Sequence, residues 1–248
     1  MECSLLSKYF PAIEKLPKGE PLTKDQLMTE EFLISQGGDL DIYYAPHNEY
    51  INKDAKIVIV GITPGWSQMR IAFESFMKGL AAEKELNAIL KETKKAASFS
   101  GGMRRNLISM LDQCGLYEAL HIDGSDTLFE RNRPLLHTTS VLKYPVFFRG
   151  NNYTGHQPDL LKTAMLAEYA TEVFPEELAQ INGHALIIPL GITAERIIRH
   201  LYTAKQLTGH IILSGFPHPS GANGHRAKQF EQNKYAMTDL IRRWGEQL

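Results

Sequence analysis

The sequence has 248 residues, of which 43% are hydrophobic and 22% are charged, the proportions of an ordinary globular protein with enough apolar material for a core. Lys and Arg (27) nearly balance Asp and Glu (28), so the net charge of -1 excludes a global field that would draw the chain onto nucleic acid or membrane. Only Cys3 and Cys114 are present, which excludes a disulfide framework, a four-cysteine zinc site and a thiolate-held iron–sulfur cluster.

The chain also lacks the marks of export and of membrane insertion. Its first residues have neither the charged start nor the long apolar stretch of a signal peptide, and no apolar run is long enough to span a bilayer. We therefore expect a cytoplasmic protein that uses no membrane, metal or cofactor. Pro and Gly are spread along the chain, so we expect one monomeric domain over residues 1–248, with residues 1–40 as a helical N-terminal extension.

In chain order, short apolar strands alternate with helical segments. Each strand is apolar almost throughout, as strands buried on both faces of a parallel sheet are. The predicted strands are KIVIVG (56–61), LLHTTSVL (135–142), HALIIPLG (184–191) and HIILSG (210–215). Apolar residues at three- and four-residue steps predict helices over 67–91, around 107–111, over 160–170, over 193–201 and after His225. This alternation predicts an α/β protein, a three-layer α/β/α sandwich around a central, mostly parallel four-stranded sheet, with DIYYA as an edge segment.

A distinctive loop follows each predicted strand. In chain order these loops are GITPGWSQ, KYPVFFRGNNYTGH, GITAE and GFPHPSGANGHR. Ligands of open α/β sheets bind at the carboxyl ends of the strands, so we expect these loops to lie close together. They contain no P-loop ending, no GxGxxG, no HExxH and no GxSxG, which argues against NTP hydrolysis, zinc proteolysis and α/β-hydrolase chemistry.

The residues in these loops suggest recognition of an anion or a base. His218 stands between two prolines in a stiff turn, where a neutral ring can donate to a developing anion. Lys143 and Arg226 can contact phosphates, and the aromatic residues of the second loop offer faces for stacking bases.

Two of these motifs resemble the uracil-DNA glycosylase superfamily. Its first motif reads GQDPY, GEAPG, GINPG or GMNPG depending on the branch, and the sequence from Gly61 to Gly65, GITPG, matches the last three in frame. Its second motif, His-Pro-Ser, is matched by His218-Pro219-Ser220. TTSVLKYP and IIPLGITAERII are similar to the segments that lie between these motifs, so the resemblance covers residues 40–245.

The resemblance implies a monofunctional DNA glycosylase, which flips uracil or another modified pyrimidine out of DNA and hydrolyses its N-glycosidic bond. It implies that His218 donates to the leaving base. Base binding would fall to Gly61, Ile62, Pro64, Gly65, Ser140 and the stacking ring of Phe73, with Phe76 as the second candidate. DNA binding would fall to Lys143, Ser220, Gly221, Asn223, His225 and Arg226.

The sequence departs from the family pattern at two positions. Thr63 stands where some branches carry an Asp or Asn that holds the attacking water, and a hydroxyl can position water but is no base near neutral pH. We therefore expect Thr63 to position water, or a base such as Glu74 to act from elsewhere. Ser140, or its neighbour Thr139, stands where the family often has a base-reading Asn, which leaves a larger modified base, such as phages use, open as substrate.

Three functions therefore follow from the sequence. The first is a DNA glycosylase for uracil or another modified base. The second is a catalytically weak or inactive module that keeps the fold and senses a base in DNA. The third is a hydrolase of free nucleosides, which the near-zero net charge favours. Phe73 and Phe76 also fit a purely structural role, because their spacing is that of a core-facing helix stripe.

Overall fold

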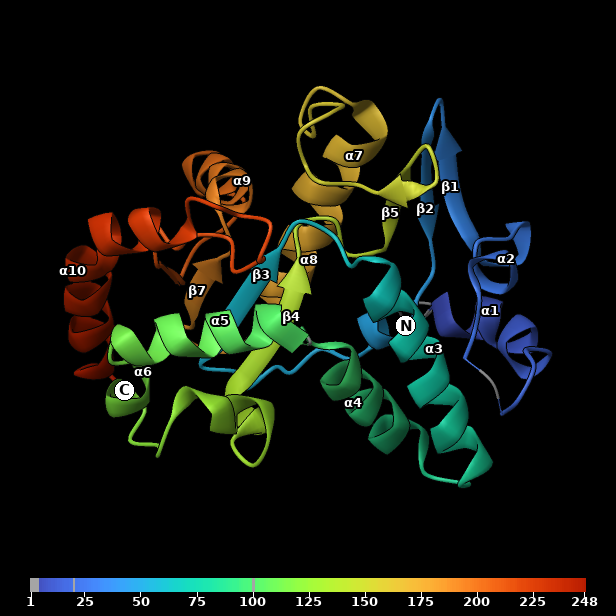
Figure 1. The fold of residues 1–248 in the computed structure, drawn as a ribbon, viewed down its shortest axis with the longest axis horizontal. Coiled ribbons are helices and arrows are strands. Elements are labelled where there is room, and N and C mark those ends of the chain that lie inside the picture. Colours follow the sequence, from blue (N-terminus) through green and yellow to red (C-terminus); the bar gives the residue numbers. More distant parts are fainter. Residues whose placement is uncertain (1–4, 20, 100) are drawn as a thin grey trace. The chain divides into compact units, whose positions relative to one another are not determined.

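The computed structural model describes residues 5–19, 21–99 and 101–248, which form two compact units (Figure 1). Unit 1 comprises the described part of Met1–Ile51 together with Thr63–Ser98 and Leu142–Ala167. Unit 2 comprises Asn52–Ile62, Phe99–Val141 and Glu168–Leu248. The chain passes between them several times, and a single domain over the whole chain stays a prediction.

Unit 2 contains the predicted parallel sheet. Its four strands run in the order β4-β3-β7-β8, all parallel, and the bounds are β3 (Ile57–Gly61), β4 (Leu136–Ser140), β7 (Leu186–Pro189) and β8 (Ile211–Ile212). The four predicted strands and their parallel sheet are thus confirmed. The helical elements of unit 2 are α5 (Gly101–Gln113), α6 (Leu116–Ala119), η3 (Ser125–Phe129), η4 (Arg133–Leu135), η5 (Tyr169–Val173), α8 (Phe174–Ala179), α9 (Ile192–Thr203) and α10 (Arg226–Gly245).

Side chains from alternate positions of these strands fill both faces of the sheet. Ile57 and Ile59 pack in a core with Leu107 of α5 and Trp244 of α10. Val58 and Val60 point to the opposite face and are also fully buried. Figure 1 shows α5 in front of the strands and α8 behind them, so helices cover both faces, as the continuous apolar runs predict.

Unit 1 is built on a second sheet, which is antiparallel and runs in the order β1-β2-β5-β6. Its strands are β1 (Leu33–Gly37), β2 (Leu40–Tyr43), β5 (Val146–Phe148) and β6 (Asn151–Asn152). Its helical elements are α1 (Leu5–Glu14), α2 (Lys24–Leu27), η1 (Glu30–Phe32), η2 (Pro46–Glu49), α3 (Trp66–Ala81), α4 (Leu86–Ala97) and α7 (Ala164–Glu168). The boundary between the units falls within α7, because Ala167 is the last residue of unit 1 and Glu168 belongs to unit 2. Residues 1–40 were expected to be a helical extension, yet they also supply β1.

The helix predicted over 67–91 is two helices. It breaks after Ala81 because Glu83 adopts a positive φ of 51°, which a regular helix does not contain. Glu85 then starts α4 as its N-cap, since its carboxylate accepts hydrogen bonds from the backbone N–H groups of Asn87 and Ala88 (3.1 Å each).

Candidate active site

The first part of the candidate site lies at the carboxyl ends of β3 and β4 in unit 2. Gly61 pairs with Ser140 across the two strands, and a Cβ added to Gly61 would lie 3.3 Å from the Ser140 Oγ. A side chain at this position would therefore require the Ser140 hydroxyl to move by a few tenths of an ångström. Gly61 and Ser140 therefore lie side by side, as expected, and the half-buried Ile62 follows Gly61 directly.

The loop of His218 leaves the carboxyl end of β8 in the same unit. The His218 ring is half-buried, and its Nδ1 accepts a hydrogen bond from the backbone N–H of Ser220 at 3.3 Å. This bond assigns the proton of the neutral ring to Nε2. Burial lowers the pKa of His218 below its ordinary value of 6.5, so the ring is neutral at pH 7. His218 can therefore donate a hydrogen bond from Nε2 without bringing a positive charge.

Side chains from elsewhere in unit 2 hold this loop in place. The Asn106 side chain on α5 donates to the Pro219 carbonyl at 2.9 Å. Gly191, at the start of α9, donates its backbone N–H to the Phe216 carbonyl at 2.9 Å. A Cβ on Gly191 would lie 3.0 Å from the His218 Cβ, so α9 begins in direct contact with the histidine. Gly191 belongs to the LGITAE turn of the family resemblance, but its contact with His218 and the role of Asn106 could not be predicted from the sequence.

The candidate DNA-binding residues of unit 2 mostly bond within the loop. Ser220 Oγ accepts from the Ala222 N–H at 3.1 Å, and Asn223 donates to the His218 carbonyl at 3.2 Å. Arg226 donates to the Ser220 carbonyl at 2.8 Å. Gly221 and His225 are exposed. These contacts give the loop a fixed shape, and contact of its residues with DNA stays a prediction.

Thr63, which begins the unit 1 part of the GITPG motif, has a structural role. Its hydroxyl donates to the Tyr144 carbonyl at 2.9 Å and accepts from the Val146 N–H at 2.9 Å. The hydroxyl proton therefore ties the motif loop to β5 and is not free for donation to water, while positioning of the attacking water through the remaining lone pair of the hydroxyl stays a prediction.

The expectation for Glu74 is also not supported. Its carboxylate is paired with Arg70 at 3.0 Å and accepts the Leu22 N–H at 3.0 Å. It is a structural residue between α3 and the segment that follows α1, and we do not assign it as a base.

Asn152 of β6 secures the other end of the motif loop. Its Oδ1 accepts the Trp66 N–H at 2.8 Å and so caps α3, while a Cβ on Gly65 would lie 3.3 Å from its Nδ2. Gly65 is thus explained by the amide that packs on it, and the preceding Pro64 is buried. Lys143, also in unit 1, places its ammonium 5.9 Å from the centre of the Tyr144 ring.

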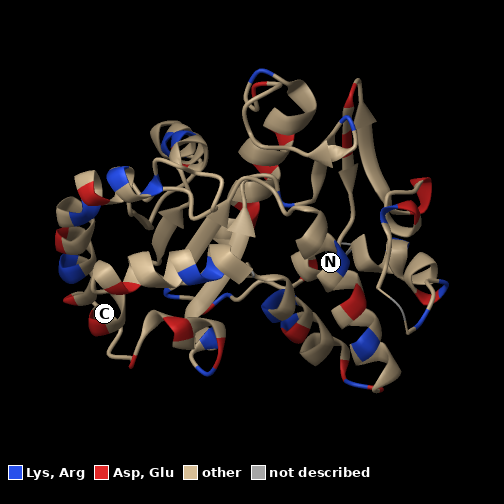
Figure 2. Ribbon diagram, in the orientation of Figure 1, with Lys and Arg blue, Asp and Glu red and all other residues tan. Residues whose placement is uncertain are grey.

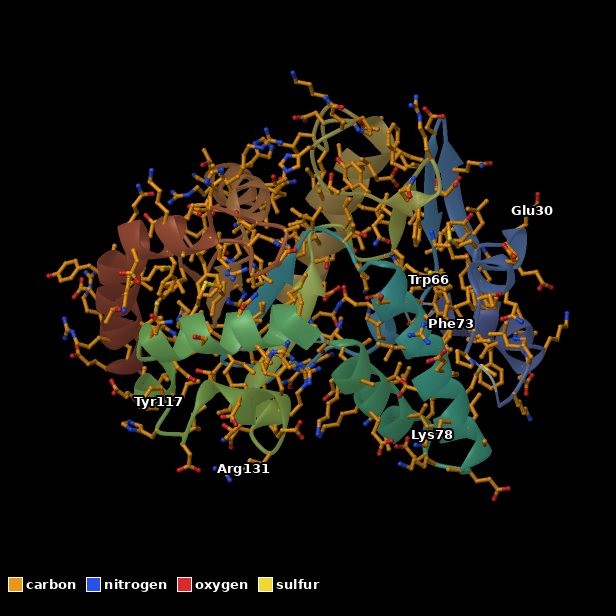
Figure 3. All side chains as sticks on the ribbon, viewed as in Figure 1. Glu30, Trp66, Phe73, Lys78, Tyr117 and Arg131 are labelled. Atoms are coloured by element: carbon orange, nitrogen blue, oxygen red, sulfur yellow. The ribbon has the colours of Figure 1, made fainter. Side chains whose placement is uncertain are left out.

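The aromatic side chains of α3 differ in their access to a ligand. Phe73 is 0% exposed, with the Phe32 ring 4.8 Å and the Tyr44 ring 6.3 Å from its own, and Phe76 is 0% exposed as well. Phe73 belongs to the aromatic core of unit 1, and a stacking role for it is not supported. Trp66 is only partly buried and lies about two turns earlier on the helix (Figure 3). Trp66 directly follows the GITPG motif, a position that the sequence did not single out.

In the described part of the chain, α10 carries charges of both signs, and metal ligands form no group of three or more that could hold an ion. Lys and Arg alternate with Asp and Glu along α10 (Figure 2). Within residues 5–19, 21–99 and 101–248, no group of three or more His, Cys, Asp or Glu side chains is arranged to hold a metal ion. Cys114 is buried, and Cys3 lies outside the described residues. The same part of the chain contains no helix with both the length and the apolar character of a membrane span.

The role of Thr63 can be tested by its effect on stability. Thr63→Val leaves the Tyr144 carbonyl and the Val146 N–H without their partner, so we expect the free energy of unfolding to fall by about 1–3 kcal/mol. Thr63→Ser keeps the hydroxyl and should lose much less. Urea unfolding of both variants measures this difference. A Thr63→Val protein as stable as the parent would show that the hydroxyl does not hold the loop.

Comparison with known protein families agrees with the motifs. The family model described as "Uracil DNA glycosylase superfamily" matches residues 49–241. The chain is 48% identical over 239 residues to "Uncharacterized protein YoxB" of Bacillus subtilis (strain 168), covering 96% of this chain and 93% of that protein. The crystal structure of wild-type SMUG2 from Pedobacter heparinus aligns with a TM-score of 0.46 and 12% identity, over 96% of this chain and 98% of that one.

Proposed function

Because the chain belongs to the uracil-DNA glycosylase superfamily, we propose that it is a monofunctional DNA glycosylase that removes uracil or another modified pyrimidine from DNA. The observation that carries the proposal is the orientation of His218. Its Nδ1 is held by the Ser220 N–H, so its Nε2 carries the proton, and the neutral ring stands at the carboxyl end of the unit 2 sheet.

The chemistry required of His218 is stabilisation of the leaving base. Water supplies the oxygen that bonds to the sugar C1′ while the C1′–N bond breaks, and the electron pair of that bond passes to the base. A donor aimed at the base atom that gathers this charge lowers the barrier. The attacking water releases a proton to solvent, the base takes one from solvent, and an abasic site remains. In this scheme the backbone of Gly61 and Ile62 and the Ser140 hydroxyl contact the base.

An incision assay tests the proposal directly. The substrates are single- and double-stranded oligonucleotides that carry uracil, hypoxanthine, hydroxymethylcytosine or its glucosylated form. Alkali converts each abasic site to a strand break, which a gel detects. We expect breaks with at least one of the three pyrimidines in a neutral buffer without added metal, whereas breaks with hypoxanthine alone would contradict a preference for pyrimidines. DNA binding without breaks on any of them would contradict the proposal.

A specific observation favours a second function. The hydroxyl of Thr63 bonds to the Tyr144 carbonyl and the Val146 N–H, so the residue at the motif position that holds water in some family branches has only one lone pair left for water here. A base-sensing module that binds DNA but hydrolyses the bond slowly or not at all fits that observation. Such a module would bind DNA with an affinity that depends on salt and would produce no abasic sites.

In either function we assign base stacking in unit 1 to Trp66 instead of Phe73. Stacking on an aromatic ring is worth about 1–3 kcal/mol per base, so Trp66→Ala should weaken binding of single-stranded DNA by that amount. The two tryptophans of the chain allow a direct measurement, because Trp244 is only 2% exposed. Oligonucleotide binding should quench the fluorescence of the Trp244→Phe variant and leave that of Trp66→Phe unchanged. The reverse pattern would exclude Trp66.

A further inference from the structure

Ile192 is an apolar side chain in an unusual place. It is the first residue of α9 and exposes 82% of its surface. Single exposed apolar residues are common on proteins, so the exposure of Ile192 alone does not indicate a binding function. The position of Ile192 is more informative, because it follows Gly191, where an added Cβ would lie 3.0 Å from the His218 Cβ.

The structure fixes the backbone of Ile192, which directly follows the glycine that contacts His218. Helix α9 is anchored in unit 2 by buried residues, namely Ala194, Ile197, Ile198 and Leu201. Glu195, in the first turn, accepts the Gly215 N–H at 2.8 Å and so ties the helix to the start of the His218 loop. A β-branched side chain in a helix has one strongly preferred χ1 rotamer, so Ile192 loses little conformational freedom on binding.

The surroundings of Ile192 also suit contact with DNA. The Glu195 carboxylate is neutralised by Arg199 at 2.8 Å, so no unpaired negative charge from this residue repels a phosphate. The loop that follows His218 offers no comparable apolar group, since Ser220 to Arg226 read SGANGHR. Among Ile192 and residues 220–226, Ile192 is therefore the bulky apolar side chain that unit 2 exposes near the His218 loop.

From these observations we infer that Ile192 enters the base stack of duplex DNA at the position of the target nucleotide and supports its displaced state. This inference rests on the proposed function and adds a positioning residue to it. Moving a base out of a duplex costs a few kcal/mol of stacking and pairing, and an apolar wedge between base steps offsets part of that cost. In single-stranded DNA there is little stack to disrupt, so the side chain has little to contribute there.

The test compares duplex with single-stranded substrate. We expect Ile192→Ala to lower the single-turnover rate of uracil excision from duplex DNA about tenfold or more, and to change the rate on the same strand alone less than twofold. Ile192→Leu keeps an apolar side chain and should restore most of the duplex rate. Tyr235→Ala, at the 87% exposed residue on α10, is the matched control and should change neither rate. Equal losses on both substrates, or no loss on the duplex, would overturn the inference.

A second measurement separates this inference from the proposed function. If the parent protein excises uracil from neither substrate, the proposed activity on uracil fails, and displacement of the base is then followed by the fluorescence of 2-aminopurine placed next to uracil in a duplex. The parent protein and the Tyr235→Ala variant should raise this fluorescence, and the Ile192→Ala variant should raise it much less. An equal rise with all three proteins would show that Ile192 does not support the displaced base.

Discussion

Replacing His218 by alanine is expected to slow base excision by about 10²- to 10³-fold, the usual cost of removing one preorganised donor from a developing anion. The physical reason is that the Nε2–H is fixed before substrate arrives. Ser220 sets the tautomer, and Asn106 and Gly191 set the position of the loop. Single-turnover excision at saturating protein measures the effect without interference from product release.

Two companion variants distinguish donation from structure. His218→Gln can place an amide N–H near the position of Nε2, so it should retain more activity than His218→Ala. His225→Ala changes an exposed histidine of the same loop and should leave the rate close to that of the parent. Affinity for the oligonucleotide, measured separately, should change little in His218→Ala. If His225→Ala and His218→Ala lose the same activity, the donor role belongs to neither ring specifically.

The lowered pKa of His218 has two consequences for pH dependence. The neutral ring is the form that donates near neutral pH, so the rate should not depend on protonation of this residue between pH 7 and 8. Folding stability should also respond. The unfolded chain has the ordinary pKa of 6.5 and binds more protons than the folded one just below that pH, so stability falls as the pH drops from 6.5 toward the lowered value. Below that value both states are protonated, and the loss levels off.

The sequence was sufficient for features that depend on neighbouring residues. The strands of unit 2 are continuous apolar runs, and a buried parallel strand needs little else, so their positions and their parallel sheet were predicted. The placement of the Gly61 and His218 loops at the carboxyl ends of that sheet followed from the same runs. The Gly61 loop and the His218 loop carry the two family motifs, and each motif is a short continuous stretch of sequence.

Features that depend on distant partners were not predictable in this way. The hydroxyl of Thr63 is occupied by groups 81 and 83 residues away, and Asn152 reaches the Trp66 N–H across 86 residues. The antiparallel sheet of unit 1 was missed because β5 and β6 have only 3 and 2 residues, too short for a periodic pattern. Phe73 shows a further limit, since helical spacing places a ring on the inner face of α3 but does not say which partners meet it there.

Gly191 combines such a distant contact with a conformation that only glycine adopts readily. Its φ of 87° and ψ of 168° lie in a region that side chains make costly by about 1–3 kcal/mol, and a Cβ there would meet the His218 Cβ at 3.0 Å. Backbone strain and overpacking together predict that Gly191→Ala lowers the free energy of unfolding by about 2–4 kcal/mol. Denaturant unfolding measures this loss.

The same substitution should also affect the chemistry, because the new methyl group can be accommodated only if α9 or His218 moves. A displacement of about 1 Å at a catalytic group can cost about 10²-fold in rate, so we expect a loss of that size at a temperature where the variant is fully folded. Gly183→Ala is the matched control in unit 2. Gly183 also has a positive φ (72°), but a Cβ there meets no atom within 4 Å, so this variant should lose stability through strain alone and keep its rate. If both variants keep the parent rate, contact with Gly191 does not position His218, and the histidine must be held by Asn106 and Ser220 without help from α9.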